Sequence, residues 1–359
     1  MTEEWRLLDP GPLAAWEQMA LDAVVIRHQA LGQSPKTFRF MQFSPHTALV
    51  GYHQSVDREL HRDVCRALGV EVNRRITGGG AIYMDSRQLG WEFCFRQEDG
   101  VAAVDADAVY QQLSQVVIRA LLEWGIQAQF RPVNDVEVDG RKISGTGGTA
   151  WDRALIYQGT LLVDFDVKTM LRVLKLPIEK LTDKAVQSFQ DRMVTMAELL
   201  GEPPAVSDVK AALIEAVEAV LGVHLRAESL TFAEEQEWEA IKDTYRQPEW
   251  IDRRRPPAGD YELREASWKA PGGLLRAALH MDDRQNRIVR AFLTGDFFVY
   301  PERAVLDLEA VLKDASASRE ALAERIRHHY ASGPQYLGVS ERDWLTLLMS
   351  AVDGKAPAV

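Results

Sequence analysis

The stretch Arg74-Arg75-Ile76-Thr77-Gly78-Gly79-Gly80-Ala81-Ile82-Tyr83, read with Gly140-Arg141-Lys142-Ile143-Ser144-Gly145 further along, decides what this chain folds into and holds. Three consecutive glycines have no Cβ atoms, so their backbone amides can approach a ligand closely. The two arginines before them carry forked donors suited to carboxylate or phosphate oxygens, and the lysine of the second stretch adds a third cation. Together the two stretches predict a pocket for an acidic, nucleotide-bearing ligand.

Neither stretch is one of the two commonest nucleotide-binding motifs. The triglycine is not followed by the Gly-Lys-Ser/Thr of a Walker A loop, and it lacks the Gly-x-Gly-x-x-Gly spacing that opens a Rossmann helix. Alone, a triglycine is as often a strand end with a flexible turn, and a lone lysine is more often a solvated surface residue. The prediction of a site therefore depends on several segments that occur together and in order.

Composition limits the class of protein. The chain has 359 residues, 46% of them hydrophobic and 26% charged, with a formal net charge of −11. Binding to nucleic acid or to anionic membranes by counterion release needs a basic surface, so we expect neither partner. Cys65 and Cys94 belong to no metal-ligand or C-x-x-C pattern, and they predict buried thiols. Without a signal peptide or an apolar run of ~20 residues, the protein is expected to be cytoplasmic.

Hydrophobic periodicity predicts alternating strands and helices. The consecutive prolines within 253–259 favour a linker, which divides the chain into domains at 1–252 and 260–359. In the first domain we expect 89–95 to pair beside the strand 70–75 that leads into the glycines. The expected strands there are 5–8, 38–43, 48–51, 70–75, 89–95 and 155–164, and the expected helices are 12–29, 60–68, 109–124, 167–174, 186–200 and 207–221. In the second domain we expect a hairpin of 274–281 with 287–294, and helices at 304–312 and 319–330.

The dipeptide Asp139-Gly140 lies between two β-like runs, which is the strongest short-range signal for a hairpin. With these two residues in the turn, the expected pairs are Val138–Arg141, Glu137–Lys142, Val136–Ile143 and Asp135–Ser144. This register puts Lys142 and Ser144 on one polar face with Asp135 and Glu137. The ammonium of Lys142 then has acceptors beside it.

Read together, the segments resemble the lipoate–protein ligase family of the biotin/lipoate ligase superfamily. The matching pieces are Arg74-Arg75-x-x-Gly78-Gly79-Gly80-Ala81-Ile82-Tyr83-x-Asp85, then Asn134-Asp135, then Gly140 to Gly145, then Gly159-Thr160-Leu161-Leu162. The resemblance covers about residues 5 to 200 and extends to Leu293-Thr294-Gly295-Asp296-Phe297-Phe298, which is similar to the accessory domain of these ligases. It implies an α+β fold, with a mixed, largely antiparallel sheet flanked by helices and a small α+β C-terminal domain.

The resemblance also implies a reaction. Enzymes of this family combine lipoate with ATP to give lipoyl-adenylate and pyrophosphate, then pass the acyl group to a lysine of a lipoyl carrier domain. Lys142 is implied as the catalytic residue that bridges the acyl carbonyl and the α-phosphate, and Asp135 as the contact to Mg²⁺ that comes with ATP. Val50, Gly51, Ile82 and Tyr83 are implied for the apolar slot of lipoate, with ordinary core as the alternative. The residues implied to bind lipoate or the adenylate are Arg75, Thr77, Gly78, Gly79, Gly80, Ile82, Tyr83, Asn134, Asp135, Ser144, Gly145, Gly159, Thr160 and Lys184, with Lys180 and Arg192 in the segment that covers the adenylate.

Three alternatives remain. An octanoyl- or lipoyl-transferase of the same superfamily forms a thioester on a cysteine downstream of the shared lysine, whereas both cysteines here precede Lys142. A biotin ligase would carry a Gly-Arg-Gly-Arg loop, which is absent. The third is a lipoate- or nucleotide-binding protein that has kept the fold and lost catalysis, and the retention of Arg75, the triglycine, Asn134, Asp135 and Lys142 weighs against it. The expected acceptor is a lipoyl carrier: an E2 domain, a glycine-cleavage H protein or a specialised lipoate-binding protein.

Overall fold

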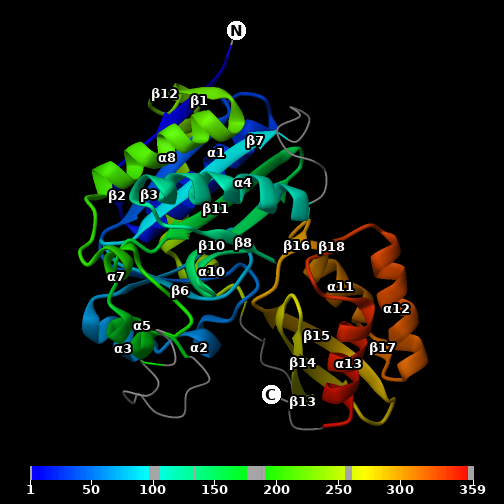
Figure 1. The fold of residues 1–359 in the computed structure, drawn as a ribbon. Helices are drawn as coiled ribbons and strands as arrows, with labels where there is room; N and C mark the ends of the chain where they lie inside the picture. The colour runs from blue at the N-terminus through cyan, green and yellow to red at the C-terminus, as the bar shows by residue number, and fades with distance from the viewer. Residues whose placement is uncertain are drawn as a thin grey trace. The chain divides into compact units, whose positions relative to one another are not determined.

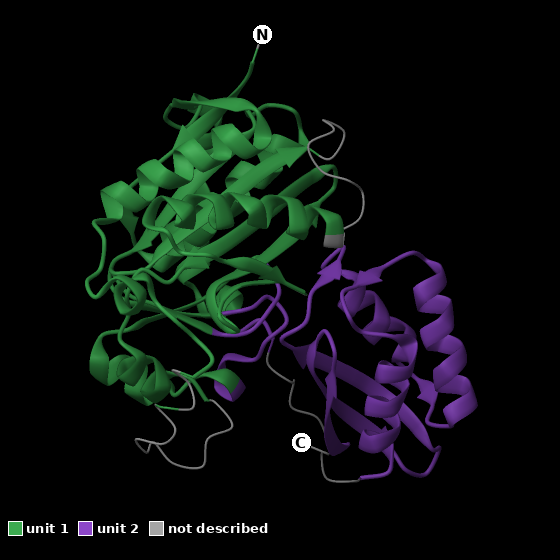
Figure 2. Cartoon of the chain, viewed as in Figure 1, with its two compact units in different colours: residues 1–49, 59–76, 82–251 green, residues 50–58, 77–81, 252–359 purple. Residues whose placement is uncertain are grey.

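The computed structural model describes residues 2–96, 106–132, 134–175, 187, 191–254 and 261–354. The chain divides into two compact units, shown in different colours in Figure 2. Unit 1 consists of Met1–Leu49, Glu59–Ile76 and Ile82–Ile251, and unit 2 of Val50–Arg58, Thr77–Ala81 and Asp252–Val359. The three glycines therefore belong to unit 2, although the strands on either side of them in the sequence belong to unit 1. Most of the expected linker, residues 255–260, lies outside the described residues.

Unit 1 is built on a nine-stranded sheet (Figure 1). Strand β1 runs parallel to β12 and β3, β2 runs parallel to β3, and the remaining neighbours are antiparallel. This confirms the expected mixed, largely antiparallel sheet flanked by helices. The order is β12 (Val223–Ala227), β1 (Glu3–Leu8), β3 (Thr37–Phe43), β7 (Leu89–Arg96), β11 (Ala154–Leu161), β10 (Arg141–Trp151), β9 (Asp135–Val138) and β8 (Gln129–Arg131), with β2 (Pro12–Leu13) beside β3.

Helices cover both faces of this sheet. On the aromatic face, Tyr157 of β11 packs edge-on against Tyr110 of α4 (Ala106–Leu121), and α8 (Val206–Leu221) packs beside α4. On the opposite face, α1 (Ala15–Ala30) packs on Cys94 and Ile156, and we call this the α1 face. Both faces of β7 are therefore buried, which its run of apolar residues requires.

A second, three-stranded sheet of order β5-β4-β6 lies in the N-terminal half of the sequence. It consists of β5 (Glu71–Arg74), β4 (Thr47–Val50) and β6 (Ile82–Met84). The expected pairing of 89–95 with 70–75 is therefore wrong. Residues 89–96 form β7 of the large sheet instead, because Trp91 and Phe93 pack there with the other aromatic side chains. The remaining elements are α2 (Val56–Glu59), α3 (Arg62–Leu68), η2 (Leu122–Trp124), α5 (Val167–Val173), α7 (Met196–Leu200), α9 (Phe232–Ile241), η3 (Lys242–Arg246) and α10 (Pro248–Ile251).

Several helix ends differ from the expected ones. Helix α1 starts at Ala15 rather than Pro12, because Pro12 and Leu13 pair with β3, and Glu17 accepts a hydrogen bond of 3.1 Å from the amide of Ala14. Helix α8 starts at Val206, one residue before the expected start, and Ala205 precedes it without a side-chain cap. The glycines at 69, 125 and 222 end helices with positive φ.

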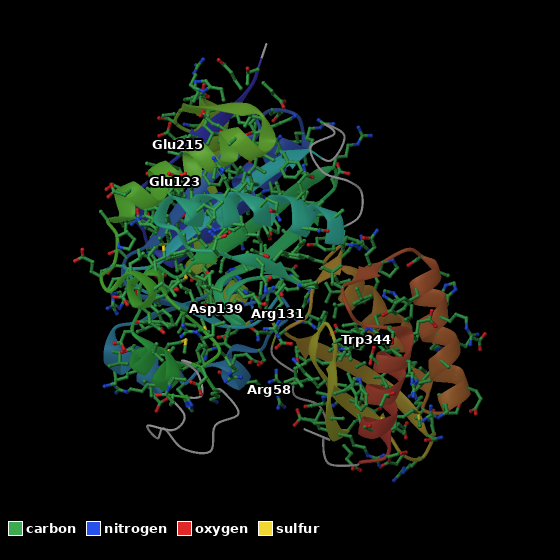
Figure 3. All side chains as sticks on the ribbon, in the orientation of Figure 1. Arg58, Glu123, Arg131, Asp139, Glu215 and Trp344 are labelled. Atoms are coloured by element: carbon green, nitrogen blue, oxygen red, sulfur yellow. The ribbon has the colours of Figure 1, made fainter. Side chains whose placement is uncertain are left out.

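Unit 2 contains an antiparallel sheet of order β13-β14-β15-β17. Its strands are β13 (Glu262–Ala270), β14 (Gly273–Asp282), β15 (Arg287–Gly295) and β17 (Ala315–Ser316). Three helices accompany the sheet, α11 (Ala304–Leu312), α12 (Arg319–Ala331) and α13 (Glu341–Val352), with a small pair of β16 (Val299–Tyr300) and β18 (Gln335–Tyr336). Trp344 of α13 is fully buried in this core (Figure 3). The expected hairpin and two helices are confirmed, and the sequence patterns missed β13 and α13.

No helix in the described ranges is both long enough and apolar enough to cross a membrane.

Candidate functional site

The β9–β10 hairpin positions Lys142. Asp139 and Gly140 form its turn with φ of 51° and 77°, the conformation that makes Asp-Gly a preferred hairpin turn. The pairs Val138–Arg141 and Glu137–Lys142 occur as expected. The start of the hairpin is thus dictated by local sequence.

Beyond Lys142 the expected register is wrong. A β-bulge between Lys142 and Ser144 makes Ser144 the partner of Val136 and Gly145 the partner of Asp135. An extra residue in one strand moves the side chains that follow to the other face. Ser144 is consequently buried beside Val136, on the face opposite Lys142. The prediction that Ser144 shares the face of Lys142 is therefore not supported.

The bulge gives the lysine its surroundings. The Nζ atom of Lys142 lies 2.6 Å from Oδ1 of Asp135, and the two side chains are 32% and 24% exposed. A Cβ atom added at Gly145 would come within 2.5 Å of Nζ and 2.6 Å of Cε, so the lysine lies directly over this glycine. Gly145 pairs with Thr160, which pairs with Gly90, and these residues lie on the α1 face. Lys142 is therefore a half-exposed cation on the α1 face, oriented by one carboxylate.

The backbone of Lys142 is held on its other side by the segment before α7. The Lys142 amide donates to the carbonyl of Arg192 at 2.9 Å, and the Val194 amide donates to the carbonyl of Lys142 at 2.9 Å. The expected helix 186–200 is therefore wrong over 191–195, where Asp191 and Arg192 form a turn and Met193 makes an isolated parallel bridge with Lys142. Strand β11 ends at Leu161 and leaves this edge of β10 open, so the backbone groups of Lys142 need another partner. Lys180 and Lys184 lie outside the described residues.

Asn134 fixes the start of β9. Its side-chain amide donates to the carbonyl of Thr146 at 2.6 Å, and its own carbonyl accepts from the amide and the hydroxyl of Thr146, each at 2.9 Å. Asn134, the residue directly before Asp135, is therefore bonded firmly to Thr146 of β10. Gly159 lies under the indole of Trp91 on the aromatic face, where a Cβ would approach the ring to 2.4 Å, whereas Thr160 shares the face of Gly145.

Arg75 lies at the end of β5 in unit 1. It is buried, 8% exposed, and its Nη1 donates to the carbonyl of Leu49 at 3.2 Å. Burial lowers the pKa of this guanidinium to about 10, although the negative charge of Asp22 acts to raise it. A desolvated guanidinium gains strongly from a second anion, so Arg75 suits an acid group of a ligand.

The other predicted residues of this region belong to β6. The hydroxyl of Tyr83 is 2.9 Å from Nδ1 of His46, and the two rings meet edge-on. Burial and the charge of Asp85 raise the pKa of Tyr83 to about 12, so it remains a neutral phenol. Ile82 is partly buried and packs on the core cluster around Met41 and Met84.

The triglycine packs within unit 2. Gly79 has φ of +89°, which favours glycine, and its amide donates to the carbonyl of Phe297 at 3.2 Å. A Cβ at Gly79 would approach the ring of Phe298 to 2.7 Å, and one at Gly78 would approach the carbonyl of Phe297 to 2.7 Å. The carbonyl of Thr77 accepts from the amide of Tyr52 at 2.9 Å. The glycines were expected to let a ligand approach their backbone closely. In this structure the backbone of Phe297 and the ring of Phe298 approach it instead.

Asp135 suits only a limited role toward Mg²⁺. Its Oδ1 already forms an ion pair with the ammonium of Lys142, and in the described part of the chain no group of three or more His, Cys, Asp or Glu side chains is arranged to hold a metal ion. Mg²⁺ bound with nucleotide usually needs only one or two protein carboxylates. The residues therefore fit an ion that arrives on ATP, and do not fit a resident metal.

Three buried charged residues of unit 1 escaped the sequence interpretation. Asp22 of α1, Arg39 of β3 and Glu92 of β7 have side chains that are 0% exposed, and Arg39 contacts both carboxylates. Each interrupts an apolar run, as in Phe38-Arg39-Phe40 and Trp91-Glu92-Phe93. A charge inside an apolar strand or helix was the signal that could have identified them, because such groups are rarely buried unpaired.

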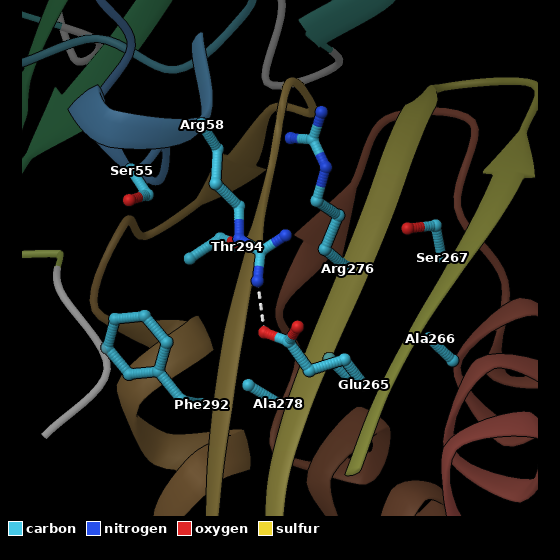
Figure 4. A pocket seen from close by; sticks show the side chains of 10 residues that line it. Ser55, Arg58, Glu265, Ala266, Ser267, Arg276, Ala278, Phe292 and Thr294 are labelled. Carbon is cyan, nitrogen blue, oxygen red and sulfur yellow. Dashed lines mark hydrogen bonds and ion pairs between the residues drawn. The ribbon is translucent and has the colours of Figure 1, made fainter. Parts of the chain in front are cut away.

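Unit 2 has a small cavity of about 150 Å³ lined by residues of β13, β14 and β15 (Figure 4). Arg58 forms an ion pair with Glu265 across it, and Ser267, Arg276 and Thr294 line the rest. Because Glu265 offsets the charge of Arg58, this cavity offers a weaker anion site than the surroundings of Arg75. We assign it no ligand.

Comparisons with known proteins identify the family of the chain. The profile of the lipoyl protein ligase A/B catalytic domain matches residues 14–218. The chain is 27% identical to the octanoyltransferase LipM of Kyrpidia tusciae over 274 residues, which are 70% of this chain and 100% of that protein. It is 25% identical to the lipoate-protein ligase LplJ of Bacillus subtilis over 340 residues, which are 92% of this chain and 95% of that protein.

Among solved structures, the chain resembles LipL1 of P. falciparum, determined in complex with lipoate. The TM-score is 0.71 with 15% identity, over 97% of this chain and 98% of that one. At this identity the likeness concerns the fold, and it extends over both units. The profile match covers more than half of the 359 residues. The chain therefore belongs to the lipoyl protein ligase A/B catalytic domain family.

Proposed function

We propose that this protein joins lipoate, or octanoate, to a lysine of a lipoyl carrier protein by way of an acyl-adenylate made from ATP. The observation that carries the proposal is the half-exposed Lys142, which lies over Gly145 and is oriented by Asp135. Forming a mixed anhydride brings a carboxylate against a phosphate. These two anions repel each other unless a cation lies between them.

Lys142 is the residue we assign to that position. Its three donors and compact charge suit oxygens of both the acyl group and the α-phosphate. Arg75 would bind the acid group, and Asn134 would keep Asp135 in place through its bonds to Thr146. Mg²⁺ carried by ATP would neutralise phosphate charge, and Asp135 would contact it. Attack of the acceptor amine then releases AMP.

The extent of the sequence matches favours a ligase over a transferase. The LipM protein is covered completely by 70% of this chain, whereas the LplJ ligase is covered to 95% by 92% of it. The LplJ ligase thus matches a larger part of this chain than LipM does. The positions of the cysteines also favour a ligase, since Cys65 and Cys94 precede Lys142 and are both buried. Burial raises the pKa of both thiols, which disfavours a thiolate nucleophile.

The second candidate is an octanoyl- or lipoyltransferase that exchanges acyl groups between carriers without ATP. The similarity to LipM favours it. The two candidates differ in one measurable product, because only the ligase releases pyrophosphate.

The test is pyrophosphate release from ATP with lipoate, followed by mass spectrometry of the adenylate. We expect release by the wild-type protein and a loss of about a hundredfold to a thousandfold in Lys142→Ala, the size measured when one transition-state donor is removed. Lys210→Ala is the matched control, since Lys210 also forms an ion pair, 2.7 Å from Asp9, on unit 1. Acyl transfer without pyrophosphate, or full activity in Lys142→Ala, would refute the proposal.

A further inference from the structure

Thr160 differs from the rest of the central strand β11. Of the residues described in this strand, Thr160 alone is only partly buried. Its backbone is paired on both sides, with Gly145 of β10 and Gly90 of β7, so the exposed part is the side chain on the α1 face. Among the described residues, none hydrogen-bonds to its hydroxyl. An unbonded, partly exposed hydroxyl in the middle of this sheet indicates that the cover of the α1 face is interrupted over Thr160.

The neighbours of Thr160 leave the space above it open. Both residues opposite it are glycines, so no side chain of a directly paired residue covers it. The ammonium of Lys142 lies above Gly145, with Nζ 2.5 Å from the position of an added Cβ. Cβ positions that face each other on paired strands are about 5 Å apart, so Nζ lies roughly 5 Å from the Thr160 side chain. One ligand oxygen, about 2.8 Å from each of two donors, fits between groups at this spacing.

This row of residues across the sheet has a polar end and an apolar end. Asp135 of β9 lies on one side of Lys142, with which it forms the ion pair. On the other side the row continues through Thr160 to Gly90 and then to Met41 of β3. Met41 is 5% exposed and belongs to an apolar core cluster, and a Cβ added at Gly90 would lie 3.0 Å from its Cβ. An acyl-adenylate has the same polarity, so its phosphate suits the Asp135 side of Lys142 and its acyl group the Thr160 side.

We propose that the hydroxyl of Thr160 is a catalytic donor which, together with the ammonium of Lys142, binds the carbonyl oxygen of the acyl-adenylate while the acceptor amine attacks. The inference rests on the proposed function, in which that adenylate is formed. It assigns Thr160 to the second half-reaction, the transfer of the acyl group.

The charge on this oxygen changes in opposite directions in the two half-reactions. In the first, one carboxylate oxygen forms the bond to the α-phosphorus, and pyrophosphate leaves with the electron pair of the broken P–O bond. The other oxygen becomes the carbonyl oxygen and loses negative charge. In the second, the amine nitrogen bonds to the carbonyl carbon, and an electron pair of the C=O bond moves onto this same oxygen. The pair returns as AMP leaves with the electrons of the broken C–O bond, and the nitrogen releases its proton to solvent.

A donor accelerates only the step in which negative charge develops on the oxygen that it binds. The hydroxyl of Thr160 therefore stabilises the transition state of acyl transfer and contributes little to the rate of adenylation. Its removal is expected to separate the two half-reactions.

Thr149 of β10 provides a matched contrast on the same face. It pairs with Ile156, is 2% exposed, and its hydroxyl has no hydrogen-bond partner among the described residues. Four positions along the strand place it about 13 Å from Gly145. Its hydroxyl is thus as unbonded as that of Thr160, but it is covered and remote from Lys142.

The experiment measures the two half-reactions separately. Pyrophosphate release at saturating lipoate and ATP reports the first. For the second, the enzyme-bound adenylate is isolated by gel filtration and mixed with hydroxylamine, and the hydroxamate is followed over time. Thr160→Val keeps the shape of the side chain and removes the hydroxyl. It is expected to release pyrophosphate close to the wild-type rate and to form hydroxamate about a hundredfold more slowly, the loss typical of one missing oxyanion donor.

Thr160→Ser restores the hydroxyl and should recover most of the transfer rate, whereas the control Thr149→Val should match the wild type in both half-reactions. Thermal unfolding is recorded for every variant, and Thr160→Ala replaces Thr160→Val if the latter does not fold. Hydroxamate formation at the wild-type rate in the folded variant would overturn the inference. An equal loss in both half-reactions would overturn it too, because it would indicate a structural role. A wild-type protein that releases no pyrophosphate would instead overturn the proposed function.

Discussion

The ammonium of Lys142 lies 2.6 Å from Asp135, although these two residues are not paired across the hairpin. The partner of Lys142 is Glu137, and the bulge after Lys142 brings Gly145 opposite Asp135. The lysine side chain can reach the carboxylate only by passing over a residue without a Cβ atom. The bulge and the glycine together therefore give the predicted catalytic lysine its position.

Gly145→Ala tests this arrangement. The new methyl group would lie 2.5 Å from Nζ of Lys142, so the flexible lysine must move away. We expect adenylation to fall by about a hundredfold, as it does when a reacting group is misplaced by about an ångström, with little change in the melting temperature. Gly125→Ala is the control, because φ there is +70° and nothing lies within 4 Å. It should lose stability and keep its activity, and the reverse pattern would contradict the role of Gly145.

Asp135→Asn tests the carboxylate. Loss of its charge leaves Lys142 without a fixed orientation, and removal of a bond between charged groups typically costs about 1.5–3 kcal/mol. We expect the rate of pyrophosphate release to drop by about tenfold to a hundredfold, with stability almost unchanged because the side chain is partly exposed. Asp9→Asn removes a comparable partner from Lys210 and should leave the rate unaffected. Equal rates in the Asp135 variant and the wild type would exclude this orienting role.

Cys65→Ala and Cys94→Ala distinguish the two candidate functions. Both cysteines are buried and precede Lys142, so a ligase should retain acyl transfer to a carrier when either is replaced. The measurement is transfer of the acyl group to a lipoyl carrier domain, followed by mass spectrometry with and without ATP. Loss of transfer in either folded variant, together with a trapped thioester in the wild type, would establish a transferase instead.

The ion pair of Arg6 and Glu234 predicts how the free energy of unfolding changes at low pH. Burial alone would raise the pKa of Glu234, but bonds from Arg6 and Ser34 lower it to about 2, from an ordinary value of 4.5. Its stabilising contribution is therefore complete above pH 4.5 and is lost as the pH falls toward 2. The expected slope in that window is about 1.4 kcal/mol per pH unit.

Urea unfolding of the wild type and of Glu234→Gln between pH 5 and 2.5 measures this contribution. The difference in unfolding free energy between the two proteins should shrink as the pH falls. A difference that stays constant across the window would show that Glu234 is not held as an anion by Arg6.

The local sequence determined a large part of the fold. Asp139-Gly140 dictates its turn because both residues tolerate positive φ, and the glycines after α3, α4 and α8 end helices for the same reason. Periodic apolar residues identified most strands and helices, and the ordered motifs identified the family. These features depend on neighbours within one turn or one strand, so a single sequence carries them.

Other features were decided only when distant segments met. The bulge at Lys142 depends on β11 pairing with β10 from Ser144 onward, and on the segment around Arg192 that occupies the open edge. The glycines join unit 2 because Phe297, more than two hundred residues later, accepts a bond from Gly79. Asp22, Arg39 and Glu92 meet only across α1, β3 and β7, since burial in a shared interior makes each charge depend on the others. Sequence patterns record which residues are apolar and where the chain turns, whereas tertiary structure alone decides which buried charges become partners.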